Sequence, residues 1–149
     1  MGLTSSLELD NPRPPALPRG GGPARSLRVV IVDEDLAVAE GLAILLELLG
    51  HEAWVAQDGP DGLAAIVTRR PDALVLDVDL PGMDGFTVAR AARGLAGAEG
   101  LSIAGLNGWG LADDRRRSRA AGFDAHFVKP VGLAELAAWL ATVQRRGDR

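Results

Sequence analysis

The chain has 149 residues, 47% of them hydrophobic and 24% charged, with a formal net charge of −4, which fits one globular domain with a tail. Cysteine is absent, which excludes disulfides, thiolate catalysis and cysteine-ligated zinc sites and agrees with a reducing compartment. The acidic balance argues against a general nucleic-acid binder, and no apolar run is long enough to cross a bilayer. We therefore expect a cytoplasmic protein that binds neither nucleic acid nor membrane.

The first 26 residues differ in composition from the rest of the chain. They hold five of the nine prolines and a run of three glycines, and they show no sustained apolar period. Such a composition is typical of a disordered tail or linker. We expect the folded domain to span residues 27–146.

From Arg28 onward, short apolar runs alternate with amphipathic patterns. Continuous apolar runs such as VVIV and ALVL are typical of strands that are buried on both faces. The runs predict strands at Arg28–Val32, Glu52–Ala56, Ala73–Leu76, Leu101–Gly105 and Ala125–Val128. The patterns between them predict helices at Leu36–Leu49, after Pro60, and at Phe86–Arg93, Leu111–Ala121 and Leu133–Val143.

Asp35 and Asp84 are suitable N-cap residues for the helices at Leu36–Leu49 and Phe86–Arg93. Gly50 follows the first helix as a stop, so that His51 is expected at the surface. The first and last helices have clear apolar stripes. The predicted stripes consist of Val38, Leu42, Leu45 and Leu49 in the first helix and Leu133, Leu136, Leu140 and Val143 in the last.

The alternation of strands and helices predicts an α/β fold with a five-stranded parallel sheet, right-handed crossovers and helices on both faces. Ligands of such open sheets bind beyond the carboxyl ends of the strands, where the winding reverses direction. In the strand order 2-1-3-4-5, this point lies between the first and third strands. The residues that follow the strands are therefore the candidates for chemistry.

Acidic residues follow both strands at this point. Asp33 and Glu34 come after the first strand and Asp77 after the third, so three carboxylates are expected in one crevice. They repel one another unless a divalent cation lies between them. A set of oxygen ligands without His or Cys suits Mg²⁺ or Mn²⁺.

Lys129 follows the fifth strand and is the only lysine, against fifteen arginines. A compact ammonium on a flexible stem can approach a carboxylate or a phosphoryl oxygen as a point charge, whereas the planar guanidinium of arginine demands a bidentate geometry. We expect Lys129 to reach across the crevice toward the carboxylates.

Three segments, VVIVDED, ALVLDVDLPGMDGF and AGFDAHFVKP, occur in this order and together resemble response regulator receiver domains, the CheY-like modules of two-component phosphorelay signalling. The resemblance spans about Ser26 to Arg145. It implies a fold of five parallel strands and five helices. It also implies that an aspartate accepts a phosphoryl group from a histidine kinase or a histidine phosphotransferase protein.

The resemblance assigns a role to each candidate residue. Asp77 matches the phosphoacceptor, and Lys129 matches the lysine that pairs with the acceptor and then with the phosphoryl oxygens. Asp33 and Glu34 match the acidic pair that holds Mg²⁺, together with the acceptor and the backbone carbonyl of Asp79. The resemblance further implies autocatalysed phosphotransfer and dephosphorylation as the only reactions, and a downstream protein that binds the face formed by helix 4, strand 5 and helix 5.

Three positions depart from the family pattern. Asn107 stands after the fourth strand where Thr or Ser is usual, Glu34 stands where Asp is common, and His126 replaces an aromatic residue. The Asn107 amide can still donate a hydrogen bond, but it differs in shape from a hydroxyl. We expect the phosphoryl chemistry to be retained and its coupling to loop movement to be altered, with His126 a packed or hydrogen-bonded ring.

Other interpretations stay open at this point. The chain is expected to be a stand-alone receiver without an output domain, but it could instead be a pseudo-receiver that acts as an unphosphorylated scaffold. A haloacid-dehalogenase-like phosphatase is the less favoured alternative, because LDVD resembles its Asp-x-Asp motif while Pro81 does not fit. Trp54 and Trp139 are expected in the core or beside a helix, and Trp109 in a loop that could contact a partner.

Overall fold

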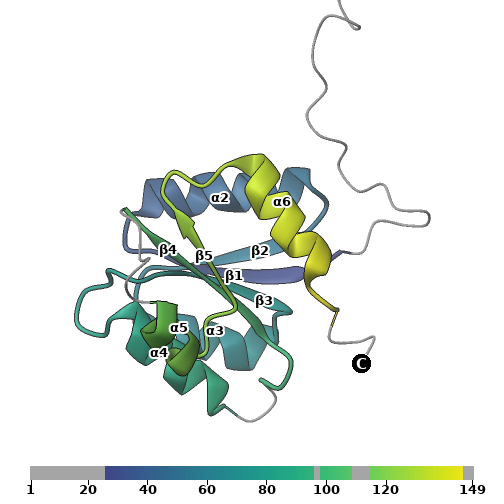
Figure 1. Cartoon of the computed structure of the whole chain (residues 1–149). Helices are drawn as coiled ribbons and strands as arrows, with labels where there is room; N and C mark the ends of the chain where they lie inside the picture. Colours follow the sequence, from purple (N-terminus) through teal and green to yellow (C-terminus); the bar gives the residue numbers. More distant parts are fainter. Residues whose placement is uncertain (1–25, 96–97, 109–114, 146–149) are drawn as a thin grey trace, which may run out of the picture.

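The computed structural model describes residues 26–95, 98–108 and 115–145, so the predicted tail lies almost entirely outside the described residues. Strands and helices alternate along the described chain (Figure 1). In chain order the elements are β1 (Arg28–Val32), α2 (Leu36–Leu48), β2 (Glu52–Ala56), α3 (Gly59–Arg69), β3 (Ala73–Asp77), α4 (Gly85–Arg93), β4 (Ser102–Asn107), α5 (Arg115–Ala121), β5 (Ala125–Val128) and α6 (Leu133–Thr142).

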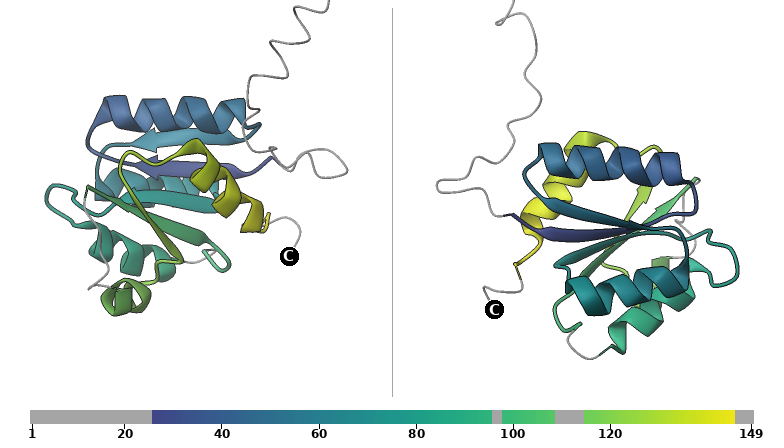
Figure 2. Two further views of the ribbon diagram at one scale, coloured as in Figure 1. Left: turned by 45° about the horizontal axis from the view of Figure 1, so that its top comes forward. Right: turned by 180° about the vertical axis from the view of Figure 1, so that it is seen from behind.

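The strands form one parallel sheet in the order β2-β1-β3-β4-β5, which confirms the predicted topology. β1 therefore lies between β2 and β3, and the winding reverses between β1 and β3. Helices α2 and α6 cover one face of the sheet, and α3, α4 and α5 cover the other (Figures 1 and 2).

The sheet separates two apolar clusters, because successive strand residues point to opposite faces. Val29 and Ile31 of β1 belong to the cluster beneath α2 and α6, whereas Val30 and Val32 belong to the cluster beneath α3, α4 and α5. All five residues of β3 are buried, as the continuous run ALVL predicts for a central parallel strand.

Several boundaries differ from the sequence-based expectation. β4 ends at Asn107 and not at Gly105, so Asn107 is the last residue of the strand and not a loop residue. In α2 the buried residues are Ala39, Leu42 and Leu46, so the face that meets the sheet is turned by about one residue from the predicted stripe. Trp109 and the residues that would begin the predicted helix at Leu111 lie outside the described residues.

The predicted environments of Trp54 and Trp139 agree with the structure, whereas that of His51 does not. Trp139 packs against Phe127 with ring centroids 6.1 Å apart, and Trp54 is half-buried at the sheet edge. His51 is not a surface residue, because it is half-buried and its Nδ1 accepts a hydrogen bond of 3.0 Å from the backbone N–H of Leu27. Within the described ranges, no helix is both long and apolar enough to span a membrane.

Candidate functional site

The site lies at the carboxyl ends of β1, β3 and β5, where three charged side chains meet. The Nζ of Lys129 lies 2.8 Å from Asp33 Oδ2 and 3.2 Å from Asp77 Oδ2. The side chains of Asp33 and Asp77 are 0% and 4% exposed, whereas that of Lys129 is 25% exposed. Lys129 thus bridges two buried carboxylates, and its ammonium compensates charges that burial would otherwise make costly.

Each carboxylate is also held by the backbone of its own loop. Asp33 Oδ1 accepts a hydrogen bond of 2.9 Å from the N–H of Asp35, and Asp77 Oδ1 accepts one of 3.0 Å from the N–H of Asp79. These turns orient both carboxylates before any ligand arrives. Asp35 itself caps α2, since its side chain accepts from the N–H of Val38, as expected for an N-cap residue.

The electrostatic balance of the site is reflected in two pKa shifts. Burial raises the pKa of Asp77, and the nearby charge of Asp33 adds to this, while the Asp79 N–H and Lys129 act in the opposite direction. Burial alone would lower the pKa of Lys129, but its hydrogen bonds and charge interactions with Asp33 and Asp77 outweigh this and raise it. The lysine therefore remains a cation, and Asp77 is a more basic carboxylate than an exposed one.

The turn after Asp77 brings the start of α4 against the site. The N–H of Gly85 donates a 3.0 Å hydrogen bond to the carbonyl of Val78. An added Cβ at Gly85 would lie 2.5 Å from the Val78 Cα and 2.8 Å from the Asp77 carbonyl oxygen, so only glycine fits there. The glycine of the MDGF segment therefore allows α4 to approach the end of β3.

Asn107 closes the site from the side of β4. It is 1% exposed, and its side-chain Nδ2 has no hydrogen-bond partner in the described structure. Its backbone carbonyl accepts a 2.7 Å hydrogen bond from the N–H of Lys129. A buried amide donor without a partner is costly, and such groups often indicate a ligand or a functional role.

The residues present suit a magnesium ion, although they differ from the expected crevice of three carboxylates. The side chain of Glu34 is exposed, and no group of three or more acidic or histidine side chains in the described chain could hold a metal. Asp33 and Asp77 alone converge, with the backbone of Asp79 next to them. This fits Mg²⁺, which is usually bound by one or two carboxylates while it keeps several waters. The metal-binding roles of Asp33, Glu34, Asp77 and the Asp79 carbonyl stay predictions.

His126 is a packed ring, as expected, but it is not hydrogen-bonded. Both ring nitrogens are buried and have no partner in the described structure, and burial lowers the pKa of the imidazole. The ring lies 4.7 Å from that of Phe123 and fills the space opposite Gly105, where an added Cβ would lie 2.6 Å from the imidazole. The sequence places His126 on the fifth strand. That it lies opposite Gly105 depends on the register of β4 and β5, which the sequence does not show.

Residues 29–141 match the family model described as the response regulator receiver domain. The chain belongs to the response regulator receiver domain family. Among curated relatives, it is 39% identical to the response regulator MprA and to the transcriptional regulatory protein PrrA, both of Mycobacterium tuberculosis, over 81% and 83% of its length. The matched part covers 52% of each relative, so the chain spans about half the length of these proteins.

Solved receiver structures have the same fold. A putative response regulator of Chloroflexus aurantiacus is 33% identical, with a TM-score of 0.72 over 78% of this chain and 95% of that one. The chemotaxis protein CheY4 of Vibrio cholerae is 26% identical, with a TM-score of 0.76 over 80% of this chain and 100% of that one. The receiver domain of the sensor histidine kinase PA1611 of Pseudomonas aeruginosa, 25% identical with a TM-score of 0.70 over 78% and 95%, was solved with a magnesium ion coordinated in its active site cleft.

Proposed function

We propose that the chain accepts a phosphoryl group on Asp77 from a phosphohistidine of a histidine kinase or phosphotransferase protein. The observation that carries the proposal is the position of Lys129, whose ammonium lies within 3.2 Å of the acceptor carboxylate and 2.8 Å of Asp33. A cation at this place can stabilise the negative charge of a phosphoryl group on Asp77.

The transfer exchanges one bond to phosphorus for another. A carboxylate oxygen of Asp77 forms a P–O bond while the P–N bond to the donor imidazole breaks, and the imidazole keeps the electron pair and takes a proton from water. The raised pKa of Asp77 makes its carboxylate a better nucleophile than an exposed aspartate. The later hydrolysis of the acyl phosphate restores the carboxylate and releases inorganic phosphate.

We propose that the acidic edge of the site holds Mg²⁺ during this reaction. The carboxylates of Asp33 and Asp77 and the backbone carbonyl of Asp79 are the proposed protein ligands, with Glu34 acting through water, since its side chain is exposed. The ion would neutralise the charge on the phosphoryl oxygens. The magnesium ion in the PA1611 receiver cleft supports this assignment.

Asn107 is the proposed second donor to the phosphoryl group. Its Nδ2 is buried and without a partner in the described structure, so a phosphoryl oxygen would satisfy a donor that the unmodified site leaves unused. The amide replaces the hydroxyl that the family pattern has at this place. Because the planar amide cannot move as a hydroxyl does, the response of the neighbouring loop is expected to differ.

The proposed downstream surface is the face of α5, β5 and α6. Val128 at the end of β5 is 50% exposed, and Leu133 at the start of α6 is 37% exposed. Val128 directly precedes Lys129, and Leu133 follows it by four residues, so both lie on the chain segment that carries the site lysine. We propose that this face binds a protein partner in the cytoplasm, and that the chain has no catalytic role beyond phosphotransfer and dephosphorylation.

Intact-mass spectrometry tests the proposed function. The chain is incubated with Mg²⁺ and a small phosphoramidate donor, and its mass is expected to rise by one phosphoryl group. In the control variant Asp77→Asn the mass should not change. An unmodified wild-type mass, under conditions in which Mg²⁺ binding is demonstrated by a thermal shift, would favour the alternative of an unphosphorylated scaffold.

A further inference from the structure

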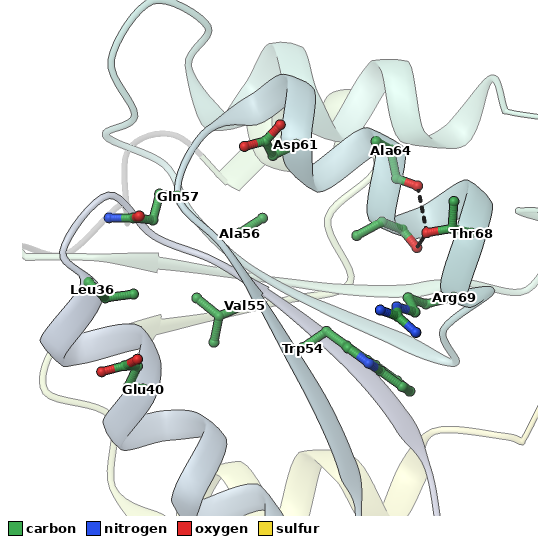
Figure 3. A pocket seen from close by; sticks show the side chains of 11 residues that line it. Leu36, Glu40, Trp54, Val55, Ala56, Gln57, Asp61, Ala64, Thr68 and Arg69 are labelled. Atoms are coloured by element: carbon green, nitrogen blue, oxygen red, sulfur yellow. Dashed lines mark hydrogen bonds between the residues drawn. The ribbon is translucent and has the colours of Figure 1, made fainter.

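A groove that takes no part in the proposed phosphoryl chemistry runs along the outer edge of β2. It has a volume of about 560 Å³ and lies between α2 and α3 (Figure 3). β2 is the terminal strand of the sheet, so no strand covers this edge in the described fold. The walls come from Leu36 and Glu40 of α2 and from Asp61, Ala64 and Thr68 of α3, and the floor comes from β2.

An indole held in a fixed position lines one end of the groove. Trp54 is half-buried, and the guanidinium groups of Arg28 and Arg69 lie 5.2 Å and 5.1 Å from its ring centroid. Arg28 Nε also donates a 2.9 Å hydrogen bond to the carbonyl of Arg69, which ties the two arginines together. These cation–π contacts orient the indole, so it needs little ordering when a ligand binds.

The other end of the groove is acidic. Glu40 and Asp61 are exposed and stand on opposite walls, as Figure 3 shows. Between them and Trp54, the surface is formed by small and apolar side chains such as Val55 and Ala64. The groove therefore suits an extended ligand with apolar residues for the indole end and basic residues for the acidic end.

We propose that this groove binds the proline- and arginine-rich segment of the same chain, PRPPALPR, at residues 12–19. Proline-dense sequences favour the polyproline II conformation, which docks on aromatic side chains at low entropic cost. Residues 11–25 contain three arginines and no acidic residue. Arg13 at one end of the segment thus complements Glu40 and Asp61, while the prolines and Leu17 supply the apolar contacts for the indole end.

The point at which the described chain begins makes this contact possible. The first described residue is Ser26, and Arg28 two residues later contacts Trp54. Residues 20–25 can span up to about 20 Å when extended, whereas the five residues of β2 span about 17 Å. The segment can therefore reach the whole groove, and its covalent link gives it a high effective concentration there.

Disulfide trapping tests the proposal, because the chain contains no cysteine and engineered ones are unique. The double variant Leu17→Cys with Thr68→Cys places one thiol in the segment and one in the groove. The matched control combines Leu17→Cys with Thr142→Cys on α6. Thr68 and Thr142 are both exposed helical threonines whose hydroxyls donate to a backbone carbonyl of their own helix.

The measured quantity is the rate of formation of the monomeric disulfide in the full chain, followed by intact mass and non-reducing gel. The reference for each rate is the same cysteine pair with Pro14, Pro15 and Pro18 replaced by serine, because most of the intervening chain is folded and its length does not set the closure rate. Binding in the groove is expected to make the Thr68 pair close about tenfold faster than its reference and to leave the Thr142 pair unchanged. Equal rates for the Thr68 pair and its reference would overturn the proposal. A dimeric product whose rate rises with protein concentration would also overturn it, in favour of docking onto a second copy.

Reversing the charges of the segment and of the groove provides a second test of the proposed contact. Adding Arg13→Glu should reduce the Thr68 trapping rate toward that of its serine-substituted reference, and adding Glu40→Arg and Asp61→Arg to that variant should restore it. A rate of disulfide formation that these charge changes do not alter would contradict the proposed charge pairing. Circular dichroism melts of all variants verify the fold, and Ala64→Cys serves as a second groove position if Thr68→Cys melts early.

Discussion

At the scale of single residues, the most informative feature is the balance of charge around Lys129. Asp33 and Asp77 are buried carboxylates, and the ammonium of Lys129 is placed between them. The ammonium of Lys129 and the N–H of Asp79 both favour the ionised form of Asp77 and so oppose the increase in pKa that burial causes. Phosphorylation or binding of Mg²⁺ would change this charge balance. Lys129 could then pair with a phosphoryl oxygen, and the two carboxylates could pair with the metal ion.

The variant Lys129→Met tests this balance without a phosphoryl donor. Removing one partner of a buried ionic group leaves uncompensated charge, so the unfolding free energy should fall by about 3 kcal/mol in chelator. Mg²⁺ should recover more stability in the variant than in the wild type, while transfer to Asp77 becomes much slower. Urea unfolding with and without Mg²⁺ measures the effect. Equal magnesium stabilisation of both proteins would show that Lys129 does not compensate these carboxylates.

A second prediction at this scale concerns His51. Its burial lowers the pKa of the imidazole, with Asp72 opposing, so the unfolded chain binds a proton more readily than the folded one. The contribution to stability is therefore present above the unfolded pKa of about 6.5 and decreases as the pH falls below it, by at most about 1.4 kcal/mol per pH unit.

Urea unfolding at pH 7.5 and pH 5.5 measures this dependence. The drop in unfolding free energy should be smaller in His51→Asn, because the asparagine oxygen can still accept from the Leu27 N–H but does not titrate. His126, whose pKa is also lowered by burial, contributes to the drop in both proteins. An identical drop in wild type and variant would contradict the role given to His51.

At the scale of elements, helix α4 is placed by the close approach of its first turn to β3. Asp84 caps this helix by accepting a 2.9 Å hydrogen bond from the N–H of Thr87, and Gly85 gives the space for the approach. The sequence MDGF therefore determines both where α4 starts and how closely it approaches Asp77.

Gly85→Ala should consequently destabilise the chain by about 2 kcal/mol or more, because its methyl group would meet backbone atoms that cannot move aside. Gly41→Ala is the matched control. Gly41 lies within α2, an added Cβ there meets nothing within 4 Å, and replacing a helical glycine by alanine should stabilise by about 0.5 to 1 kcal/mol. Thermal or urea unfolding gives both values, and similar losses in the two variants would refute the steric argument.

At the scale of the whole molecule, burial decreases from the centre of the sheet to its edges. β3 is buried throughout and β1 almost so, whereas the residues of β5 are half-buried or exposed and β2 is an edge strand beside the groove. The two apolar clusters therefore share the central strands β1 and β3, and Asp33 and Asp77 stand at the carboxyl ends of these buried strands.

Hydrogen exchange should report this gradient. Amides of β1 and β3 are expected to exchange through global unfolding and to be the slowest, while those of β2 and β5 exchange faster through local opening. Exchange of each strand by mass spectrometry after proteolysis, or by NMR, provides the measurement. The prediction fails if β5 amides are as protected as those of β3.

Much of this architecture could be predicted from the sequence. The runs VVIV and ALVL, the helix stripes and the Asp caps depend on local periodicity and short-range hydrogen bonds, so they identify the strands, the helices and the fold class directly. The alignment of Asp33, Asp77 and Lys129 at one sheet edge also follows, because parallel strands bring their carboxyl ends together.

Other features were decided only by the tertiary structure, because they depend on where distant side chains meet. The sequence alone could not show that Glu34 is exposed while Asp33 and Asp77 share one ammonium. Nor could it show that Gly105 makes room for His126, or that His51 accepts from the N–H of Leu27. The groove beside Trp54 likewise exists only once α2 and α3 are packed on opposite sides of the edge strand. Local patterns determine which elements form, whereas side-chain contacts across them require the register and the depth of packing.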